Sequence, residues 1–137
     1  MNEKVEYKGI EYQVTKVQTS AGTAYKKPKE GNEFVVITLS LKNKNDEKVT
    51  YSYQNWKMTN SKLELSGRIF VPISDTVALY SGSLVVGGQK TGSLVFEQPI
   101  NDPELIIHFY ELDDETNYTD QVEVENKIFS FRIIISK

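Results

Sequence analysis

The stretch Glu33-Phe-Val-Val-Ile-Thr-Leu-Ser-Leu-Lys-Asn43 decides the fold that this sequence predicts. Apolar residues occupy alternate positions in it, namely Val35, Ile37, Leu39 and Leu41. The residues that alternate with them after Ile37 are polar. Because successive side chains of a strand point to opposite faces of a sheet, this pattern predicts a β-strand with one face buried in an apolar core.

Comparable patterns on both sides of this stretch predict further strands. They cover residues 5–7, 10–17, 49–59, 92–97, 104–111 and 128–135. A break falls near Gln54, and residues 77–79 fit either a short strand or a helical turn. Asn-rich and Gly-Gly turns separate the strands, and few segments carry a helical apolar stripe. We therefore expect an all-β fold of about seven to nine antiparallel strands packed as a β-sandwich.

The length of 137 residues suits one domain spanning residues 1–137. The chain begins Met-Asn-Glu-Lys without an apolar signal core, so it is either a cytosolic protein or a mature form whose leader has been removed. We expect the second, with residues 1–8 forming a loose extension after that leader.

Composition excludes several classes of protein. The chain is 39% hydrophobic and 26% charged, and no apolar run approaches the roughly 20 residues of a membrane-spanning helix. Its net charge of −3 argues against nucleic acid as a partner. It has no cysteine, which removes disulfides, thiol nucleophiles and thiolate metal sites. We expect no cofactor.

Two blocks carry a resemblance to a known family. The first runs from Gly31 through the Asn43–Asp46 turn to Trp56-Lys-Met58, and the second is Leu84–Gly88 followed by Gln89-Lys-Thr-Gly-Ser-Leu-Val-Phe-Glu97 and Pro99. They resemble a family of uncharacterised domains of Gram-positive surface lipoproteins. The resemblance implies an immunoglobulin-like sandwich, similar to a mycobacterial secreted immunoprotective antigen, and a lipid-modified cysteine that this chain lacks. It implies no chemistry.

The residues that could support catalysis or metal binding are few. His108 is the only histidine, so a histidine-based triad within one chain is impossible, and we expect a histidine at the surface or at a sheet edge. The acidic connection after Glu111 offers carboxylates for calcium, which prefers oxygen ligands. The candidates are Asp113, Asp114, Glu115 and Asp120. The pattern lacks the glycine and the final glutamate of an EF-hand loop, and calcium remains a weak hypothesis against a solvated loop.

Aromatic residues suggest a different kind of site. Tyr51 and Tyr53 fall on one face of a predicted strand and could form a platform for sugar rings, whereas Trp56 is expected in the core.

The sequence therefore favours a non-enzymatic binding domain of a Gram-positive lipoprotein, which acts outside the cytoplasm on another protein at the cell surface. A cell-wall glycan-binding module and a structural spacer are the alternatives, as is a cytoplasmic location. The acidic connection and residues 60–82 are the first places in which to look for the binding surface.

Overall fold

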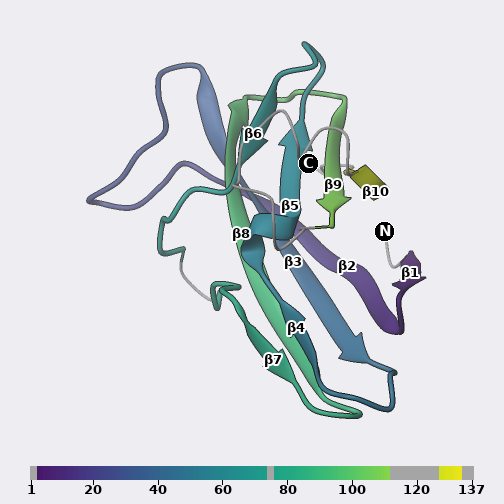
Figure 1. Ribbon diagram of the computed structural model, residues 1–137. Coiled ribbons are helices and arrows are strands. Elements are labelled where there is room, and N and C mark those ends of the chain that lie inside the picture. Colours follow the sequence, from purple (N-terminus) through teal and green to yellow (C-terminus); the bar gives the residue numbers. More distant parts are fainter. Residues whose placement is uncertain (1–2, 74–75, 112–126, 134–137) are drawn as a thin grey trace.

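The computed structural model describes residues 3–73, 76–111 and 127–133 of the chain. Its strands form two four-stranded sheets, with the orders β1-β2-β3-β8 and β10-β9-β5-β6, and one two-stranded sheet, β4-β7 (Figure 1). All pairs of named strands are antiparallel. The elements are β1 (Lys4–Tyr7), β2 (Ile10–Ser20), β3 (Asn32–Asn43), β4 (Val49–Tyr51), η1 (Tyr53–Asn55, a 3-10 helix), β5 (Trp56–Thr59), β6 (Leu65–Gly67), β7 (Gly82–Leu84), β8 (Gln89–Pro99), β9 (Leu105–Tyr110) and β10 (Lys127–Ile133). The predicted all-β antiparallel sandwich is confirmed.

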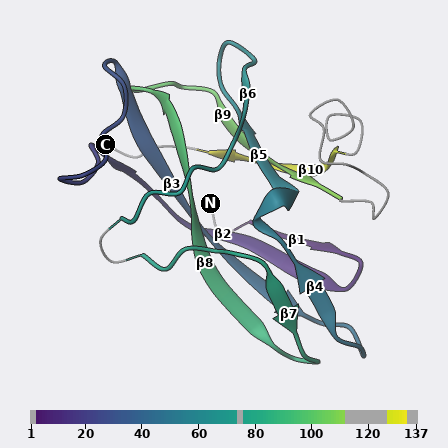
Figure 2. The same ribbon diagram turned by 60° about the vertical axis from the view of Figure 1, so that its left-hand side comes forward.

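The core takes its side chains from both four-stranded sheets, whose strands Figure 2 shows from a second side. From β3 it takes the four alternating residues that the sequence indicated, and all four are buried. From β5 and β9 it takes Trp56, Met58, Ile107 and Phe109, which lie opposite one another in the register of the two strands. The core is therefore built from residues at every second position of these strands, whose side chains point to the same face of their sheet.

The chain changes sheets between β4 and β5. Ser52 caps η1, because its hydroxyl accepts a hydrogen bond from the Gln54 amide at 3.1 Å and its own amide donates to Asn55 Oδ1 at 3.1 Å. This turn is the break expected near Gln54. It sends β4 to pair with β7 and β5 to pair with β9 and β6, so the returning strand is divided between two sheets.

Two segments, residues 4–7 and 77–79, have a structure that the sequence did not predict. Residues 4–7, which fall within the expected loose extension, form β1 and pair with β2 over their whole length. Residues 77–79 form neither a named strand nor a helix: Ala78 makes an isolated bridge to Ser93, and the Leu79 amide donates to the Ser93 carbonyl at 2.9 Å.

The chain between β6 and β7 passes along β8 (Figures 1 and 2). Ile69 forms an isolated bridge with Val95, and Val77 accepts a hydrogen bond from the Ser93 amide. These contacts cover the edge of β8 that β3 leaves unpaired, as edges commonly are in stable sheets. On the outer face, Val71 and Val95 join a second apolar cluster with Phe34 and Val36 of β3.

Gly92 fixes how closely this segment approaches β8. A Cβ at Gly92 would lie 2.9 Å from both Cα and Cβ of Leu79, a fully buried residue. We expect Gly92→Ala to lower the free energy of unfolding by about 1–3 kcal/mol, because the clash is with backbone. Urea denaturation followed by circular dichroism measures the loss.

Gly67→Ala is the matched control for Gly92→Ala. At Gly67 of β6, the added methyl would meet only the end of the flexible Lys57 side chain, at 3.2 Å. We expect little change, since the side chain can move aside. If both variants lose the same stability, the close approach of Leu79 to Gly92 is not what positions the segment.

Candidate functional site

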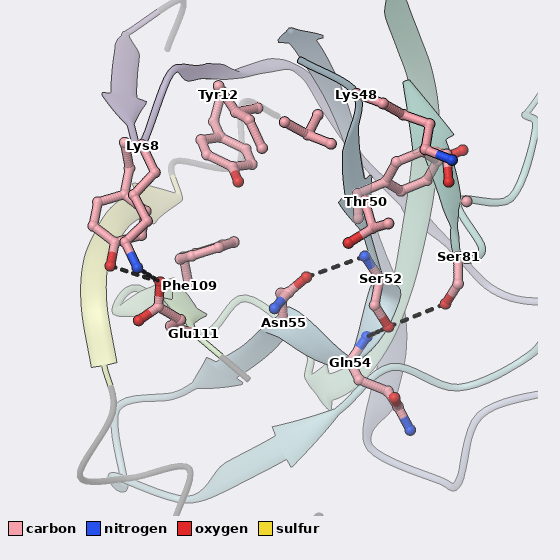
Figure 3. A pocket seen from close by; sticks show the side chains of 16 residues that line it. Lys8, Tyr12, Lys48, Thr50, Ser52, Gln54, Asn55, Ser81, Phe109 and Glu111 are labelled. Atoms are coloured by element: carbon pink, nitrogen blue, oxygen red, sulfur yellow. Dashed lines mark hydrogen bonds and ion pairs between the residues drawn. The ribbon is translucent and has the colours of Figure 1, made fainter. Parts of the chain in front are cut away.

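One hollow is an open cleft of about 890 Å³ between the β1-β2 hairpin and the β4-β7 pair (Figure 3). The buried rings of Tyr12 and Phe109 line its inner side, and polar side chains that include Lys48, Thr50 and Gln54 line its rim. It combines an apolar floor with a polar entrance, a composition common to ligand-binding clefts.

Two of the charged groups that line this cleft, Lys8 and Glu111, are paired with each other. Glu111 Oε2 lies 2.6 Å from Lys8 Nζ and accepts a hydrogen bond from the Tyr7 hydroxyl at 2.9 Å. The bond from Lys8 lowers the pKa of Glu111, so this carboxyl is ionised at neutral pH. Glu111 is also the only acid among the described lining residues. The two carboxyl groups with separated pKa values that glycoside hydrolysis requires are therefore not assembled here.

The second hollow, of about 380 Å³, lies against β8 beneath residues 68–80. We call it the Arg68 pocket, and its described lining includes Arg68, Phe70, Pro72, Thr76, Tyr80 and Ser93. The guanidinium carbon of Arg68 lies 3.9 Å from the ring centre of Phe70, 5.0 Å from that of Tyr53 and 5.2 Å from that of Tyr80. Three aromatic rings thus surround one cation, an arrangement that stabilises the charge through the ring faces.

The hydrogen-bonding capacity of Arg68 is largely unused. Its Nε and Nη1 atoms are buried and have no hydrogen-bond partner. Burial lowers the pKa of the Arg68 guanidinium, although the group stays charged at neutral pH. Buried polar groups in folded proteins are almost always bonded, and an exception is a candidate for function.

The rings around Arg68 are also unusually exposed for their size. Phe70 is 58% exposed and Tyr80 is 57% exposed, and their rings stack with centres 6.3 Å apart. Val77, on the same segment, is 65% exposed. Neighbouring exposed apolar side chains around a hollow are typical of a docking surface, whereas scattered ones are not.

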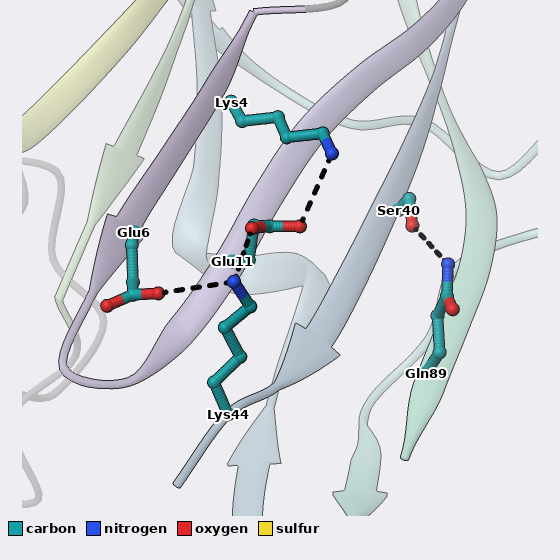
Figure 4. A network of polar contacts seen from close by, with 6 residues as sticks. All are labelled: Lys4, Glu6, Glu11, Ser40, Lys44 and Gln89. Atoms are coloured by element: carbon teal, nitrogen blue, oxygen red, sulfur yellow. Dashed lines mark hydrogen bonds and ion pairs between the residues drawn. The ribbon is translucent and has the colours of Figure 1, made fainter. Parts of the chain in front are cut away.

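A polar network covers the outer face of the β1-β2-β3-β8 sheet (Figure 4). Lys44 Nζ lies 2.9 Å from Glu11 and 3.8 Å from Glu6, and Lys4 lies 3.9 Å from Glu11. The hydrogen bond from Lys44 lowers the pKa of Glu11. These are exposed ion pairs of the kind that contribute at most about 1 kcal/mol each, and they form a solvated face.

His108 is not at the surface, which corrects the sequence expectation. It is 6% exposed, and its ring nitrogens lie 2.8 Å from Thr59 Oγ1 and 2.6 Å from Ser130 Oγ. The register places Ser130 directly across from His108 on β10. Hydroxyl groups from the two neighbouring strands therefore hold the imidazole within the sheet.

The other predicted site residues have different outcomes. Tyr51 and Tyr53 lie on different elements, because Tyr51 ends β4 and lines the open cleft while Tyr53 lies in η1 and contacts Phe70 and Arg68. They do not form one platform. Trp56 lies in the core as expected. The four calcium candidates lie outside the described residues: Asp113, Asp114, Glu115 and Asp120.

The described residues contain no group of three or more His, Cys, Asp or Glu side chains suited to hold a metal ion. In the same part of the chain, no helix has the length and apolar character needed to cross a membrane.

Sequence reasoning did not identify Arg68. It indicated residues 60–82, in which Arg68 lies, as one of the first places in which to look for the binding surface, but it singled out no residue within them. The aromatic residues around it are distant from one another in sequence, and nothing in their spacing predicts that they meet at one side chain.

Solved structures share this fold. The yjhA protein from Bacillus subtilis superposes with a TM-score of 0.68 at 17% identity, over 99% of this chain and 98% of that one. The Bacillus subtilis protein ycdA, described as a "putative lipoprotein", superposes with a TM-score of 0.70 at 9% identity, over 95% of this chain and 38% of that one. An uncharacterised β-sandwich protein from Clostridium difficile gives a TM-score of 0.52 at 11% identity, over 98% and 91%.

A search of curated proteins finds no match to the sequence. A family model does match, over residues 1–126, and its description is a domain of unknown function, DUF4352. The chain therefore belongs to the DUF4352 family of domains of unknown function.

Proposed function

We propose that this chain is a non-catalytic binding domain that acts outside the cytoplasm and docks another protein at the Arg68 pocket. One observation carries the proposal: exposed aromatic rings surround a charged guanidinium whose buried Nε and Nη1 atoms have no hydrogen-bond partner. Aromatic and arginine side chains are the residues that most often dominate protein interfaces.

The fold supports this proposal because it holds the segment that carries Phe70 and Tyr80 rigidly against a sheet. The ring-bearing segment is bonded to β8 by the Ile69, Val77 and Leu79 backbone contacts. In turn, β8 pairs along its whole length with β3, whose apolar residues are fully buried. A recognition surface held on a sheet loses little conformational entropy when it binds. The likeness to ycdA, described as a "putative lipoprotein", favours a location at the cell surface.

Binding of labelled domain to intact cells of the source organism tests the proposal. We expect saturable binding that is lost when the cells are first treated with protease, because the partner is a protein. The double variant Phe70→Ser/Tyr80→Ser should weaken this binding by at least roughly tenfold, the usual effect of removing central interface residues. Circular dichroism checks that the variant is folded.

Val85→Ser/Val86→Ser is the matched control, because these residues are similarly exposed, at 67% and 58%, but line neither hollow. This variant should bind like the wild type. Absence of saturable binding to cells would refute the function, and equal losses in the two double variants would refute its location at the Arg68 pocket.

A further inference from the structure

The Arg68 pocket offers one unsatisfied recognition group. Two of the three hydroxyl groups that line it are already bonded, since Thr76 donates to the Ile73 carbonyl at 2.7 Å and Ser93 shares a 2.9 Å hydrogen bond with Thr38. The third belongs to Tyr80, and Arg68 is the only charged group of the described lining. Aromatic faces attract the guanidinium charge but do not replace a planar acceptor for its N–H groups. The described side chains supply no such acceptor to Nε and Nη1, and a ligand that reaches the guanidinium could supply one.

The described lining of the pocket contains no carboxylate and no second cation. A guanidinium forms paired hydrogen bonds with either a carboxylate or a phosphate. A polyanion such as a phosphodiester chain is normally held by several basic groups, and here there is one, set among apolar side chains such as Val71, Pro72 and Ile73. This lining favours a ligand with a single negative charge and an adjoining apolar group.

The size of the pocket narrows the choice further. A volume of about 380 Å³ lies at the small end of ligand sites and admits the last one or two residues of a peptide. The last residue of a peptide carries its carboxylate and its side chain on the same Cα, so both can enter together. An internal Asp or Glu carries the carboxylate at the tip of its side chain and brings no apolar group with it.

We propose that the Arg68 pocket binds the free carboxyl terminus of a partner protein whose last residue is apolar. The terminal carboxylate pairs with Arg68, and the last side chain packs against Phe70 and Tyr80. The inference rests on the proposed function, because it names the chemistry that the same docking site recognises.

The chain permits a direct test, because Arg68 and Arg132 are its only arginines. The Nε–Hε resonances of both can be followed by nuclear magnetic resonance while N-acetyl-leucine is added. We expect the Arg68 resonance and the backbone amides of Ala78 and Val95 to shift saturably. Arg132, which lies on β10 in the other sheet, should not shift.

Three further probes test which chemical group of the ligand Arg68 recognises. N-acetyl-leucinamide, which lacks the carboxylate, and inorganic phosphate should leave Arg68 unshifted. N-acetyl-aspartamide, whose only carboxylate is on the side chain, should bind at least roughly tenfold more weakly than N-acetyl-leucine because its apolar contact is lost. Equal shifts with acid and amide, or stronger binding of phosphate or of the aspartyl probe, would overturn the proposal.

Two variants complete the test. Arg68→Lys keeps the positive charge but not the planar pair of donors, so it should weaken the binding of N-acetyl-leucine by roughly tenfold. The shifts of the Ala78 and Val95 amides measure that affinity. Arg132→Lys should leave it unchanged. Asp75 lies outside the described residues, and Asp75→Asn should preserve the binding of the probe. Loss of binding in Asp75→Asn, or unchanged binding in Arg68→Lys, would refute the assignment.

The two proposals can fail separately. If N-acetyl-leucine does not bind but labelled domain still binds cells through Phe70 and Tyr80, only the carboxyl-terminal chemistry is wrong. If the probe binds at Arg68 but cells do not bind the domain, the pocket is a carboxylate site and the cell-surface function is wrong.

Discussion

Replacement of Trp56 by alanine is expected to lower the free energy of unfolding by about 3–5 kcal/mol, the range found when a large aromatic side chain is removed from a packed core. Trp56 is 1% exposed. Its ring contacts those of Tyr12, Phe109 and Phe129 at centre-to-centre distances of 5.7, 5.1 and 6.0 Å. The residue joins β5 to strands of both sheets, so its removal leaves a cavity where the two layers meet.

Urea denaturation followed by circular dichroism measures this effect, since the variant has lost the tryptophan that fluorescence would report. Tyr25→Ala is the control, because Tyr25 is 99% exposed and should contribute nothing measurable. A loss below about 1 kcal/mol for Trp56→Ala would contradict the packing described between the sheets.

The fold could be predicted from the sequence wherever one face of a strand is buried. β3 after Ile37 and β10 carry the apolar-polar alternation that a half-buried strand requires. The strands β3, β8, β9 and β10 all overlap their expected ranges. The burial of Trp56 followed from the same reasoning. Alternation is visible in sequence because it depends only on neighbours along the chain.

The outer face of β3 shows the limit of that reasoning. Phe34 and Val36 point away from the main core, yet they are fully buried. Val71, Ile69 and Ile73 of the segment after β6 pack with them, and Val95 lies beside Val36 on β8. The uninterrupted apolar run Phe34–Ile37 was the available signal that both faces are covered at this end. The covering segment has no periodicity of its own, so nothing in it predicted where it would lie.

The candidate site was beyond prediction for the same physical reason. Tyr53, Arg68 and Tyr80 come from a 3-10 helix and from an irregular segment, and their meeting depends on backbone bonds to β8 that only the tertiary structure supplies. In contrast, the expected tyrosine platform assumed one continuous strand. The turn at Ser52 divides that strand and turns Tyr53 toward Arg68 instead.

Asn43 is expected to have the second-largest effect on stability. It is 1% exposed, and its Nδ2 donates to the carbonyl oxygens of Glu47, Leu84 and Val85 at 2.9, 3.0 and 3.1 Å. Its Oδ1 accepts a hydrogen bond from the Asn45 amide at 2.8 Å. One side chain therefore fastens the end of β3 to its own turn and to the β7-β8 turn.

Asn43→Ala should lower the free energy of unfolding by about 2–4 kcal/mol, because it removes all four hydrogen bonds that this buried side chain makes to backbone groups. Asn45→Ala is the matched control. Its Nδ2 donates one exposed hydrogen bond, to the Lys8 carbonyl at 2.8 Å, so its loss should cost about 0.5–1.5 kcal/mol. Urea denaturation compares the two, and equal losses would contradict the role of Asn43 as a buried link.

Asn43→Asp separates hydrogen bonding from side-chain volume, because Asp has nearly the same shape but cannot donate from the position of Nδ2 when ionised. Carbonyl oxygens around the new carboxylate should raise its pKa in the folded state above the unfolded value of about 3.9. The folded state then binds the proton more tightly, so the variant should gain stability relative to wild type as the pH falls through the raised pKa. If Asn43→Asp matched the wild type at neutral pH, volume and not donation would be what Asn43 contributes.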